Sequence, residues 1–415
     1  MKHRRVAVTG MGLISPVGND VPATWHSLLT GVSGAALITK FDAHAFPVRF
    51  AAEVKGFDPL MYMERKEAKR ADMYTQYAVA ASVQAMRDAG LEPGVNVEPE
   101  RIGVIVGSGI GGLKSFEEQH DVYHDNGPSR ISPFFIPMFI ADIAAGIVSM
   151  RFNAKGPNYA TVSACATGAH AIGSAFRAIQ YGDADVMITG GSEATVTPMA
   201  IGGFANMKAL SERNDSPATA SRPFDATRDG FVMGEGAGIV ILEEMEHAIE
   251  RGARIHAELV GFGMTGDAYH LTAPAPGGEG ARRAMRMAMN DGELEIEDID
   301  YINAHGTSTP TGDISETTAI KGVFGDRAGE INVSSTKSAT GHMLGAAGGA
   351  EFIFTALALR ECIVPPTLNY GTPDPACDLN YTPNTPVRRA MQAALSNSFG
   401  FGGHNVTLAV RRYDG

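Results

Sequence analysis

The sequence predicts a layered α/β fold, in which a sheet is covered by helices on both of its faces. Short β-branched runs that end in glycine recur along the chain, and they are continuously apolar, as strands buried on two sides require. Helical patterns lie between several of these runs. The runs are VAVTGMG (6–12), IGVIVGSGIGG (102–112), DVMITGG (185–191), AGIVILEE (237–244) and AELVGFG (257–263).

Local patterns predict one strand and two helices in the first half of the chain. The first strand is expected in RRVAVTGMG, and a helix is expected in TWHSLLTG, where Trp25, Leu28 and Leu29 share one face. The helix in SAFRAIQYGDAD is predicted to end at Gly182, because glycine is favoured just after the last helical turn.

The length and an internal repeat predict two halves. A chain of 415 residues exceeds the size that one hydrophobic core usually supports. VSACATGAHAIGSA (162–175) resembles VSSTKSATGHMLGAAGGA (333–350): each reads as a short strand, a reactive residue and a Gly/Ala-rich helix start. VAVTGMG likewise resembles ELVGFGM (258–264). We therefore expect two similar halves, residues 1–250 and 251–415.

Composition argues against several classes of protein. The net charge of −12 disfavours nucleic-acid binding, which needs a basic surface. The apolar stretch 134–150 is short for a membrane span and contains Pro137 and Asp142, so a buried helix or a subunit interface is expected in place of membrane insertion. Cys165, Cys362 and Cys377 match neither a disulfide framework nor a zinc site. We expect no metal and a reducing, cytoplasmic location.

Cys165 is the first candidate for chemistry. It lies at a predicted strand-to-helix turn, where the positive end of the following helix lowers the pKa of a thiol and favours the thiolate. The small residues from Ala164 to Gly168 leave room for a substrate. The alternative is an inert cysteine packed among alanines.

Two histidines strengthen the case for a reactive site. His305 lies in YINAHGTSTPTGD (301–313), and His342 lies in SSTKSATGHMLGAAGG (334–349), five residues after Lys337. Neutral imidazoles can donate hydrogen bonds to a developing enolate oxygen, and a nearby ammonium group helps to keep them neutral. A single histidine is more often a surface or core residue without chemistry.

The loop GSGIGG (107–112) offers a competing interpretation. It formally fits the glycine pattern of dinucleotide-binding loops. It does not follow the first strand, however, and no acidic residue about 20 positions later closes a βαβ unit. A nucleotide site is therefore the weaker interpretation.

With these residues placed, the chain resembles the β-ketoacyl-acyl-carrier-protein synthases of the thiolase superfamily, most closely the type II synthases of bacterial fatty-acid synthesis. The resemblance runs nearly from end to end and implies a thiolase fold, five-layered αβαβα with two similar halves, assembled as a homodimer. The matching motifs include VTGMGLISPVGND, ISPFFIP, SACATGAH, GDADVMITGGSEA, SRPFDATRDGFVMGEGAG, GDAYHLTAP, NAHGTSTPTGD, SSTKSATGHMLGAAG and NSFGFGGHN.

The resemblance also implies a role for each candidate residue. Cys165 takes the acyl chain as a thioester; His305 and His342 then stabilise the enolate formed when malonyl carrier protein loses carbon dioxide, and Lys337 sets the electrostatics around His342. Further residues are implied in the oxyanion hole (the N–H groups of Cys165 and Phe401), in contacts with the phosphopantetheine arm (Thr307 and Thr309), at the wall of the acyl pocket (Ile110 and Phe204) and at a gate between the acyl and malonyl pockets (Phe401). The segment 134–147 would cross the dimer to close the acyl pocket.

The implied partner is an acyl carrier protein, which brings its own phosphopantetheine, so no resident cofactor is expected. Because carrier proteins are acidic, the synthase needs a local basic surface. The candidates are Lys66, Lys69, Arg70, Lys208 and Arg213, with an ordinary solvated helix face as the alternative for each.

Two alternatives keep the fold and change the function. One is a ketosynthase of a polyketide pathway, and the other is a non-catalytic partner of the chain-length-factor type. The second lacks the nucleophile, so Cys165 counts against it. A thiolase would need a further cysteine where this chain has NSFGFGGHN.

Overall fold

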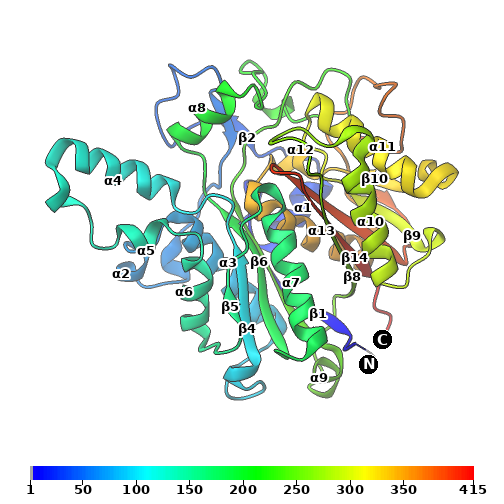
Figure 1. The fold of residues 1–415 in the computed structure, drawn as a ribbon, viewed down its shortest axis with the longest axis horizontal. Helices are drawn as coiled ribbons and strands as arrows, with labels where there is room; N and C mark the ends of the chain where they lie inside the picture. The colour runs from blue at the N-terminus through cyan, green and yellow to red at the C-terminus, as the bar shows by residue number, and fades with distance from the viewer. Residues whose placement is uncertain (1–2) are drawn as a thin grey trace.

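The computed structural model describes residues 3–415 and contains one large sheet surrounded by helices (Figure 1). Its ten strands lie in the order β10-β9-β13-β14-β8-β1-β7-β6-β4-β5. The strands are β1 (Val6–Ile14), β2 (Ala35–Leu37), β3 (Phe50–Ala52), β4 (Ile102–Gly107), β5 (Asn158–Tyr159), β6 (Val186–Glu193), β7 (Gly236–Glu244), β8 (Ala257–Gly266), β9 (Ile299–Asn303), β10 (Asn332–Ser334), β11 (Ile363–Val364), β12 (Val387–Arg388), β13 (Ala393–Gly400) and β14 (His404–Arg411). The pairs β2-β3 and β11-β12 lie outside the large sheet.

Helices connect and cover these strands. They are α1 (Val21–Leu29), α2 (Arg65–Ala68), α3 (Met73–Ala89), α4 (Leu113–Asn126), α5 (Phe135–Phe139), α6 (Ile143–Phe152), α7 (Thr167–Tyr181), α8 (Pro198–Asn206), α9 (Met245–Glu250), α10 (Glu279–Asp291), α11 (Pro310–Phe324), α12 (Lys337–Thr340) and α13 (Ala347–Glu361). Two short 3₁₀ turns bear on the site: η4 (Ala164–Ala166) precedes α7, and η9 (Leu344–Ala346) precedes α13.

The sheet is built from two halves with the same topology. The order β5-β4-β6-β7-β1 in the first half corresponds to β10-β9-β13-β14-β8 in the second. In each half the first three strands in that order are parallel, and the last two are added antiparallel. A short antiparallel contact between β1 and β8, from Val6–Val8 to Ala257–Leu259, joins the halves. The expected pair of similar halves is therefore confirmed.

The halves stack into five layers. Helices α3 and α6 cover the outer face of the first sheet half, and α10 and α11 cover the outer face of the second (Figure 1). Helices α7 and α13 pack against each other and against strands of both halves, so they form the central layer. The predicted αβαβα order is thus confirmed.

Residue alternation in β7 shows why the strands are apolar on both sides. Val240 and Leu242 belong to the central core, whereas Ile239 and Ile241 belong to the outer core with α3. All four are fully buried. Because both faces of the strand are covered, neither side can be polar, which explains the continuous apolar runs.

The local predictions agree with the structure at most elements. The five apolar runs form β1, β4, β6, β7 and β8, and Gly182 follows the last residue of α7 in a left-handed conformation with φ 83°. Trp25 and Leu28 are buried on α1. The stretch 134–150 forms α5 and part of α6, and across residues 3–415 no helix is both long and apolar enough to cross a membrane.

The short strand expected directly before Cys165 is not formed. Cys165 does not follow a strand directly, since β5 ends at Tyr159 and the chain then runs irregularly into η4. The counterpart of the η4–α7 unit is η9–α13, which places Gly345, and not Lys337, in the position equivalent to Cys165. The short helix α12 and the loop that carries His342 precede this unit in the second half only.

Candidate active site

Cys165 lies on a tight turn between the central helix α7 and the cavity. Ala164, just before it, has a φ of +50°, and Leu344 in the equivalent turn of the second half has a φ of +47°. A residue with a β-carbon rarely adopts this conformation, so the surrounding packing must hold it. The turn presents a thiol that is only 9% exposed.

One cavity of about 360 Å³ gathers most of the predicted site. It reaches Cys165 from the first half and His305 and His342 from the second, although these residues are far apart in the sequence. Phe204, Lys208, Thr307, Thr309 and Phe401 also line this cavity. The expected convergence of one thiol and two imidazoles is therefore present.

The two imidazoles face each other at close range. The ring centres of His305 and His342 are 5.3 Å apart, and the rings are nearly perpendicular at 85°. Both ring nitrogens of His342, and Nδ1 of His305, are buried without a hydrogen-bond partner among residues 3–415. Buried polar atoms are almost always paired. Unpaired atoms beside a cavity are therefore positioned for a ligand.

The backbone fixes each imidazole from outside the cavity. The N–H of His305 and that of Gly306 donate to the carboxylate of Glu316, at 2.9 and 2.8 Å. The N–H of His342 donates to the carbonyl of Val232 at 2.7 Å, and its carbonyl accepts from Gly234 at 2.8 Å. These hydrogen bonds hold the main chain of both histidines. They leave Nδ1 of His305 and both ring nitrogens of His342 without a partner among the described residues.

Lys337 does not line the cavity. It begins α12, it is 1% exposed, and its ammonium group forms an ion pair with Glu351 on α13. Burial raises the pKa of Glu351 to about 7, against the lowering effect of the Lys337 charge. Lys337 therefore acts on the site through its charge and not by contact with the cavity.

Burial and the Lys337 charge keep both imidazoles unprotonated. Burial lowers the pKa of His305 and His342 well below the usual range, and the ammonium group of Lys337 lowers it further. Both shifts favour the neutral imidazoles that the sequence predicts. Each ring can donate one N–H bond and accept one in this state.

The prediction of a ready thiolate at Cys165 is wrong. Burial raises the pKa of the thiol to about 12, although the Lys337 charge and the N–H groups of Phe401 and Cys165 lower it. The helix terminus was expected to dominate, but loss of hydration outweighs it. The thiol is therefore protonated at neutral pH.

Phe401 reaches the thiol because Gly400 packs directly on the turn. A β-carbon at Gly400 would lie 2.7 Å from the carbonyl oxygen of Ser163 and 3.2 Å from the nitrogen of Cys165. This close approach brings the N–H of Phe401 to the sulfur, beside the N–H of Cys165 itself. Two converging donors are the arrangement of an oxyanion hole.

Of the four other residues predicted to bind substrate, three line the cavity and one does not. Thr307 and Thr309 line the cavity with their hydroxyl oxygens 3.0 Å apart, and Phe204 contacts the ring of Phe401 at 6.3 Å between centres. Ile110 lies apart from the wall of this cavity and is 36% exposed.

The predicted basic residues lie at two separate places. Lys208 lines the cavity mouth and pairs with Glu212 at 3.1 Å, and Arg213 pairs with Asp229 at 3.4 Å. Lys66, Lys69 and Arg70 lie on or just after α2, and the Arg70 guanidinium stacks over Phe134, 4.2 Å from its ring centre.

Sequence reasoning missed the buried carboxylates that organise the site. Glu316 and Glu351 hold the His305 loop and Lys337. Glu193 accepts hydrogen bonds from Ser108, Gly109 and Ile110 in GSGIGG and from Gly345 in η9. Since Glu193 occupies the N–H groups of that glycine loop, they are not free for a phosphate. Within residues 3–415 no cluster of three or more His, Cys, Asp or Glu side chains could hold a metal ion.

The duplicated fold, the buried thiol and the paired neutral imidazoles define an acyltransferase of the thiolase-fold class. Residues 3–248 match the family model for the β-ketoacyl synthase N-terminal domain, and residues 256–371 match that for its C-terminal domain. The chain therefore belongs to the β-ketoacyl synthase family.

Individual relatives are similar over the whole chain. A protein of Staphylococcus aureus (strain COL) named 3-oxoacyl-[acyl-carrier-protein] synthase 2 is 54% identical, covering 100% of this chain and 99% of its own. The protein of that name from Synechocystis sp. is also 54% identical, with the same coverage. A type II polyketide ketosynthase solved with its acyl-carrier protein (AntDE:AntF) is 36% identical, with a TM-score of 0.92 over 99% of this chain and 100% of that one.

Proposed function

We propose that this chain condenses malonyl-acyl carrier protein with an acyl group held on Cys165. The chain is an acyltransferase of the 3-oxoacyl-[acyl-carrier-protein] synthase 2 type, and its reaction is the elongation step of fatty-acid synthesis. The observation that carries the proposal is the single cavity shared by Cys165, His305 and His342. Relatives of that name at 54% identity support the assignment to fatty-acid synthesis over a polyketide pathway.

The first half-reaction moves the acyl group to the protein. The sulfur of Cys165 attacks the thioester carbonyl, and the carrier thiol leaves. Because the pKa of Cys165 is about 12, its proton must depart as the new bond forms, and it ends on the sulfur of the leaving carrier thiol. The oxyanion is stabilised by the N–H groups of Cys165 and Phe401.

The second half-reaction makes the carbon–carbon bond. Malonyl carrier protein loses carbon dioxide, and the electron pair of the broken bond becomes an enolate. The N–H groups of His305 and His342 stabilise its oxygen, and no strong base is needed. The enolate carbon attacks the Cys165 thioester, and the sulfur leaves as a thiolate that takes up a proton from the solvent. The product is a 3-oxoacyl-acyl carrier protein.

The proposal also assigns the residues that contact the substrate and the carrier protein, the boundary between the halves and the location in the cell. Thr307 and Thr309 bind the phosphopantetheine arm, Phe401 gates the two pockets, Phe204 borders the acyl chain inside the cavity, and Ile110 borders it beyond the cavity wall. The carrier protein docks on Lys66, Lys69, Arg70, Lys208 and Arg213. The halves divide between residues 250 and 251, and the protein works in the cytoplasm, where three free cysteines are stable.

The two half-reactions can be separated by experiment. Incubation with acyl carrier protein substrate should add one acyl mass to Cys165, and Cys165→Ser should abolish the adduct. His305→Ala and His342→Ala should each slow release of carbon dioxide from malonyl carrier protein by about 10²–10³-fold, because each removes an enolate donor. Acylation of Cys165 should fall far less.

One control variant and two contrary results complete this test. His124→Ala, which changes an exposed ring on α4, should leave both half-reactions unchanged. Absence of any acyl adduct on the wild-type chain would favour the non-catalytic partner. Equal loss of acylation and decarboxylation in both histidine variants would contradict the division of roles.

A further inference from the structure

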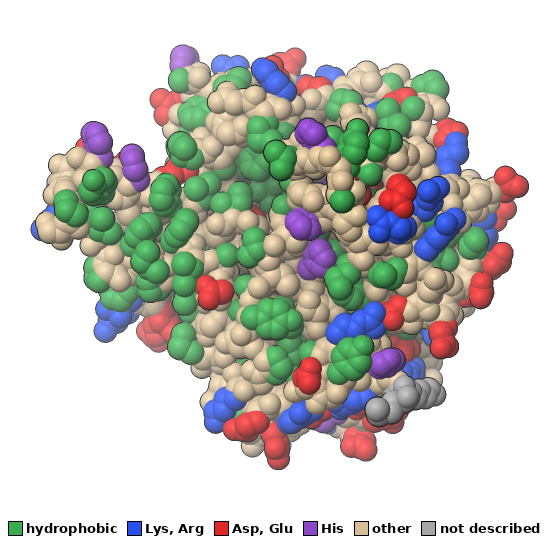
Figure 2. Space-filling model, viewed as in Figure 1, with side chains coloured by type: hydrophobic (Ala, Val, Ile, Leu, Met, Phe, Trp, Pro, Cys, Tyr) green, Lys and Arg blue, Asp and Glu red, His purple; other side chains and the backbone are tan. Residues whose placement is uncertain are grey.

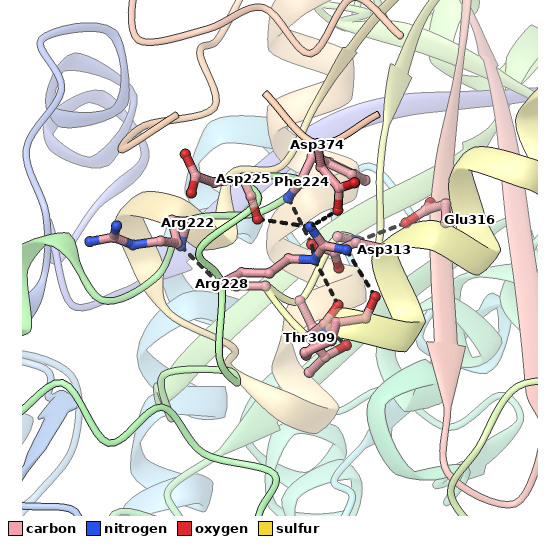
Figure 3. Close-up of polar contacts among 12 residues, drawn as sticks. Arg222, Phe224, Asp225, Arg228, Thr309, Asp313, Glu316 and Asp374 are labelled. Atoms are coloured by element: carbon pink, nitrogen blue, oxygen red, sulfur yellow. Dashed lines mark hydrogen bonds and ion pairs between the residues drawn. The ribbon is translucent and has the colours of Figure 1, made fainter. Parts of the chain in front are cut away.

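A buried arginine lies behind the cavity, outside the reactive trio. Arg228 precedes the cavity-lining segment Asp229–Phe231, and its side chain is 3% exposed. Figure 3 shows its guanidinium at the centre of a polar network between this segment and the start of α11. Neither half-reaction involves Arg228. Burying its charge is nevertheless costly without partners, so its contacts need an explanation.

The guanidinium binds the loop that carries the two threonines. Nε donates to the carbonyl of Thr309 at 3.1 Å, and Nη2 donates to the carbonyl of Pro310 at 2.9 Å (Figure 3). Two residues further on, the N–H of Gly230 donates to the carbonyl of Ser308 at 3.1 Å. Three consecutive carbonyls of the loop are thus held by the segment 228–230.

This contact fixes where the threonine side chains point. With the carbonyls of residues 308–310 bound behind the loop, the side chains of Thr307 and Thr309 line the cavity, and their hydroxyl oxygens lie 3.0 Å apart. Ser308 between them is buried with a φ of +69°, a conformation that a non-glycine residue keeps only when its surroundings impose it. Its carbonyl accepts from the N–H of Gly230 and its hydroxyl oxygen accepts from the N–H of Arg222 at 3.0 Å, next to the two carbonyls that Arg228 holds.

The charge of Arg228 is already balanced, so it is not available to a substrate. Nη1 donates to the Asp374 carboxylate at 2.7 Å and to the carbonyl of Asp225 at 2.8 Å. The Asp313 carboxylate lies 3.5 Å from Nε and accepts from the N–H of Phe224 at 2.8 Å (Figure 3). A buried guanidinium engaged in four hydrogen bonds and two ion pairs acts on the reaction through the loop that it holds.

We propose that Arg228 is a positioning residue, which orients the hydroxyl groups of Thr307 and Thr309 toward the thioester-bearing arm of the carrier. The inference rests on the proposed function, since it assigns the arm to these threonines. A planar guanidinium with five donors suits several carbonyls at once, whereas a lysine at this place could bind fewer of them.

The test separates binding of the arm from chemistry. Arg228→Met should raise KM for malonyl-pantetheine about tenfold, the change expected from one lost hydrogen-bonded contact, with kcat nearly unchanged. Arg228→Lys should give an intermediate KM, and it keeps the test open if the methionine variant does not fold. Thr309→Val should raise KM to a similar degree, and Arg228→Met with Thr309→Val should raise it no further, because both changes remove the same contact.

A second buried arginine provides the matched control. Arg251 on the C-terminal side of α9 is 13% exposed at its side chain, binds the buried Glu243 through two nitrogens and does not line the cavity. Arg251→Met should therefore lower thermal stability without a change in KM.

Each outcome bears on one claim. If Thr309→Val raises KM and neither Arg228 variant does, the positioning role of Arg228 is wrong. The same holds if the Arg228 variants lower kcat at constant KM, or if the double variant shows the product of the two single effects. If Thr309→Val leaves KM unchanged, the arm does not bind at these threonines, whereas acylation of Cys165 would still test the condensing activity itself.

Discussion

Three groups that ordinarily titrate near or above neutrality meet in one cavity, and burial keeps all three uncharged. The pKa of Cys165 is raised, and those of His305 and His342 are lowered, with loss of hydration as the largest cause in each case. The buried Lys337–Glu351 ion pair adds a fixed charge behind them. The site is therefore suited to stabilise charge that develops during the reaction and not charge that exists beforehand.

The raised thiol pKa predicts a distinct pH profile for alkylation. In a Cys362→Ser, Cys377→Ser background, the rate of Cys165 alkylation by iodoacetamide should rise about tenfold per pH unit from pH 7 to 9.5, because the thiolate fraction does so far below the pKa. A cysteine in an unstructured peptide, with a pKa near 8.5, should level off across the same range. If the alkylation rate of the protein instead levels off below pH 8, the pKa of Cys165 is low and the thiolate that the sequence predicts is present.

At the scale of elements, the turn η4 depends on the end of β13. Strand β13 delivers Gly400 against the backbone of residues 163–166, and only hydrogen fits there. Because the next residue, Phe401, supplies an N–H group to the sulfur, the register of this contact sets the proposed oxyanion site.

Gly400→Ala should therefore impair acylation specifically. The new methyl group would lie 2.7 Å from the carbonyl oxygen of Ser163, so the Phe401 loop must move away from the turn. Loss of one oxyanion donor predicts a fall in the acylation rate of about 10²–10³-fold, followed by mass spectrometry of the Cys165 adduct.

Gly203→Ala on α8 is the matched control, because no atom lies within 4 Å of the added carbon outside the helix backbone. It should acylate at the wild-type rate. A normal rate in Gly400→Ala would mean that the Phe401 N–H does not serve the oxyanion.

The same elements show what the sequence can and cannot predict. Glycine-terminated apolar runs identify β1, β4, β6, β7 and β8, since buried strands have a strong local signature. The letters ATG occur at Ala166–Gly168 and at Ala339–Gly341, but these positions belong to α7 and α12, which are not equivalent helices of the two halves. The pKa of Cys165 and the role of Glu193 depend on burial and on contacts between distant segments, which no local pattern reports.

At the scale of the whole molecule, the two similar halves contribute different residues to the cavity. The two halves share one topology, yet the proposed nucleophile Cys165 comes from the first and both imidazoles come from the second. Gly345 stands where the second half would have its own cysteine, and it packs against Gly109 and Glu193 of the first half. One cavity between the halves is therefore served by both.

The surface over α4, α5 and α6 predicts a dimer. Large apolar side chains are exposed there, and Figure 2 shows them gathered on the side from which α4 and α5 project. Ile136 is 57% exposed and Met150 is 73% exposed, beside β5 at the free edge of the large sheet. Such a patch and edge are normally covered in solution.

We expect sedimentation equilibrium at micromolar concentration to give twice the monomer mass. The pair Ile136→Asp and Met150→Asp should weaken association by about a thousandfold or more, because each lost apolar contact counts twice across a two-fold interface. Val95→Asp, a change at a loop residue that is 78% exposed, is the matched control and should remain dimeric. If the wild-type chain sediments as a monomer, this surface is not the homodimer interface, and the segment 134–147 cannot close a partner's acyl pocket. If the double variant stays dimeric with the wild-type affinity, the chains associate through another face.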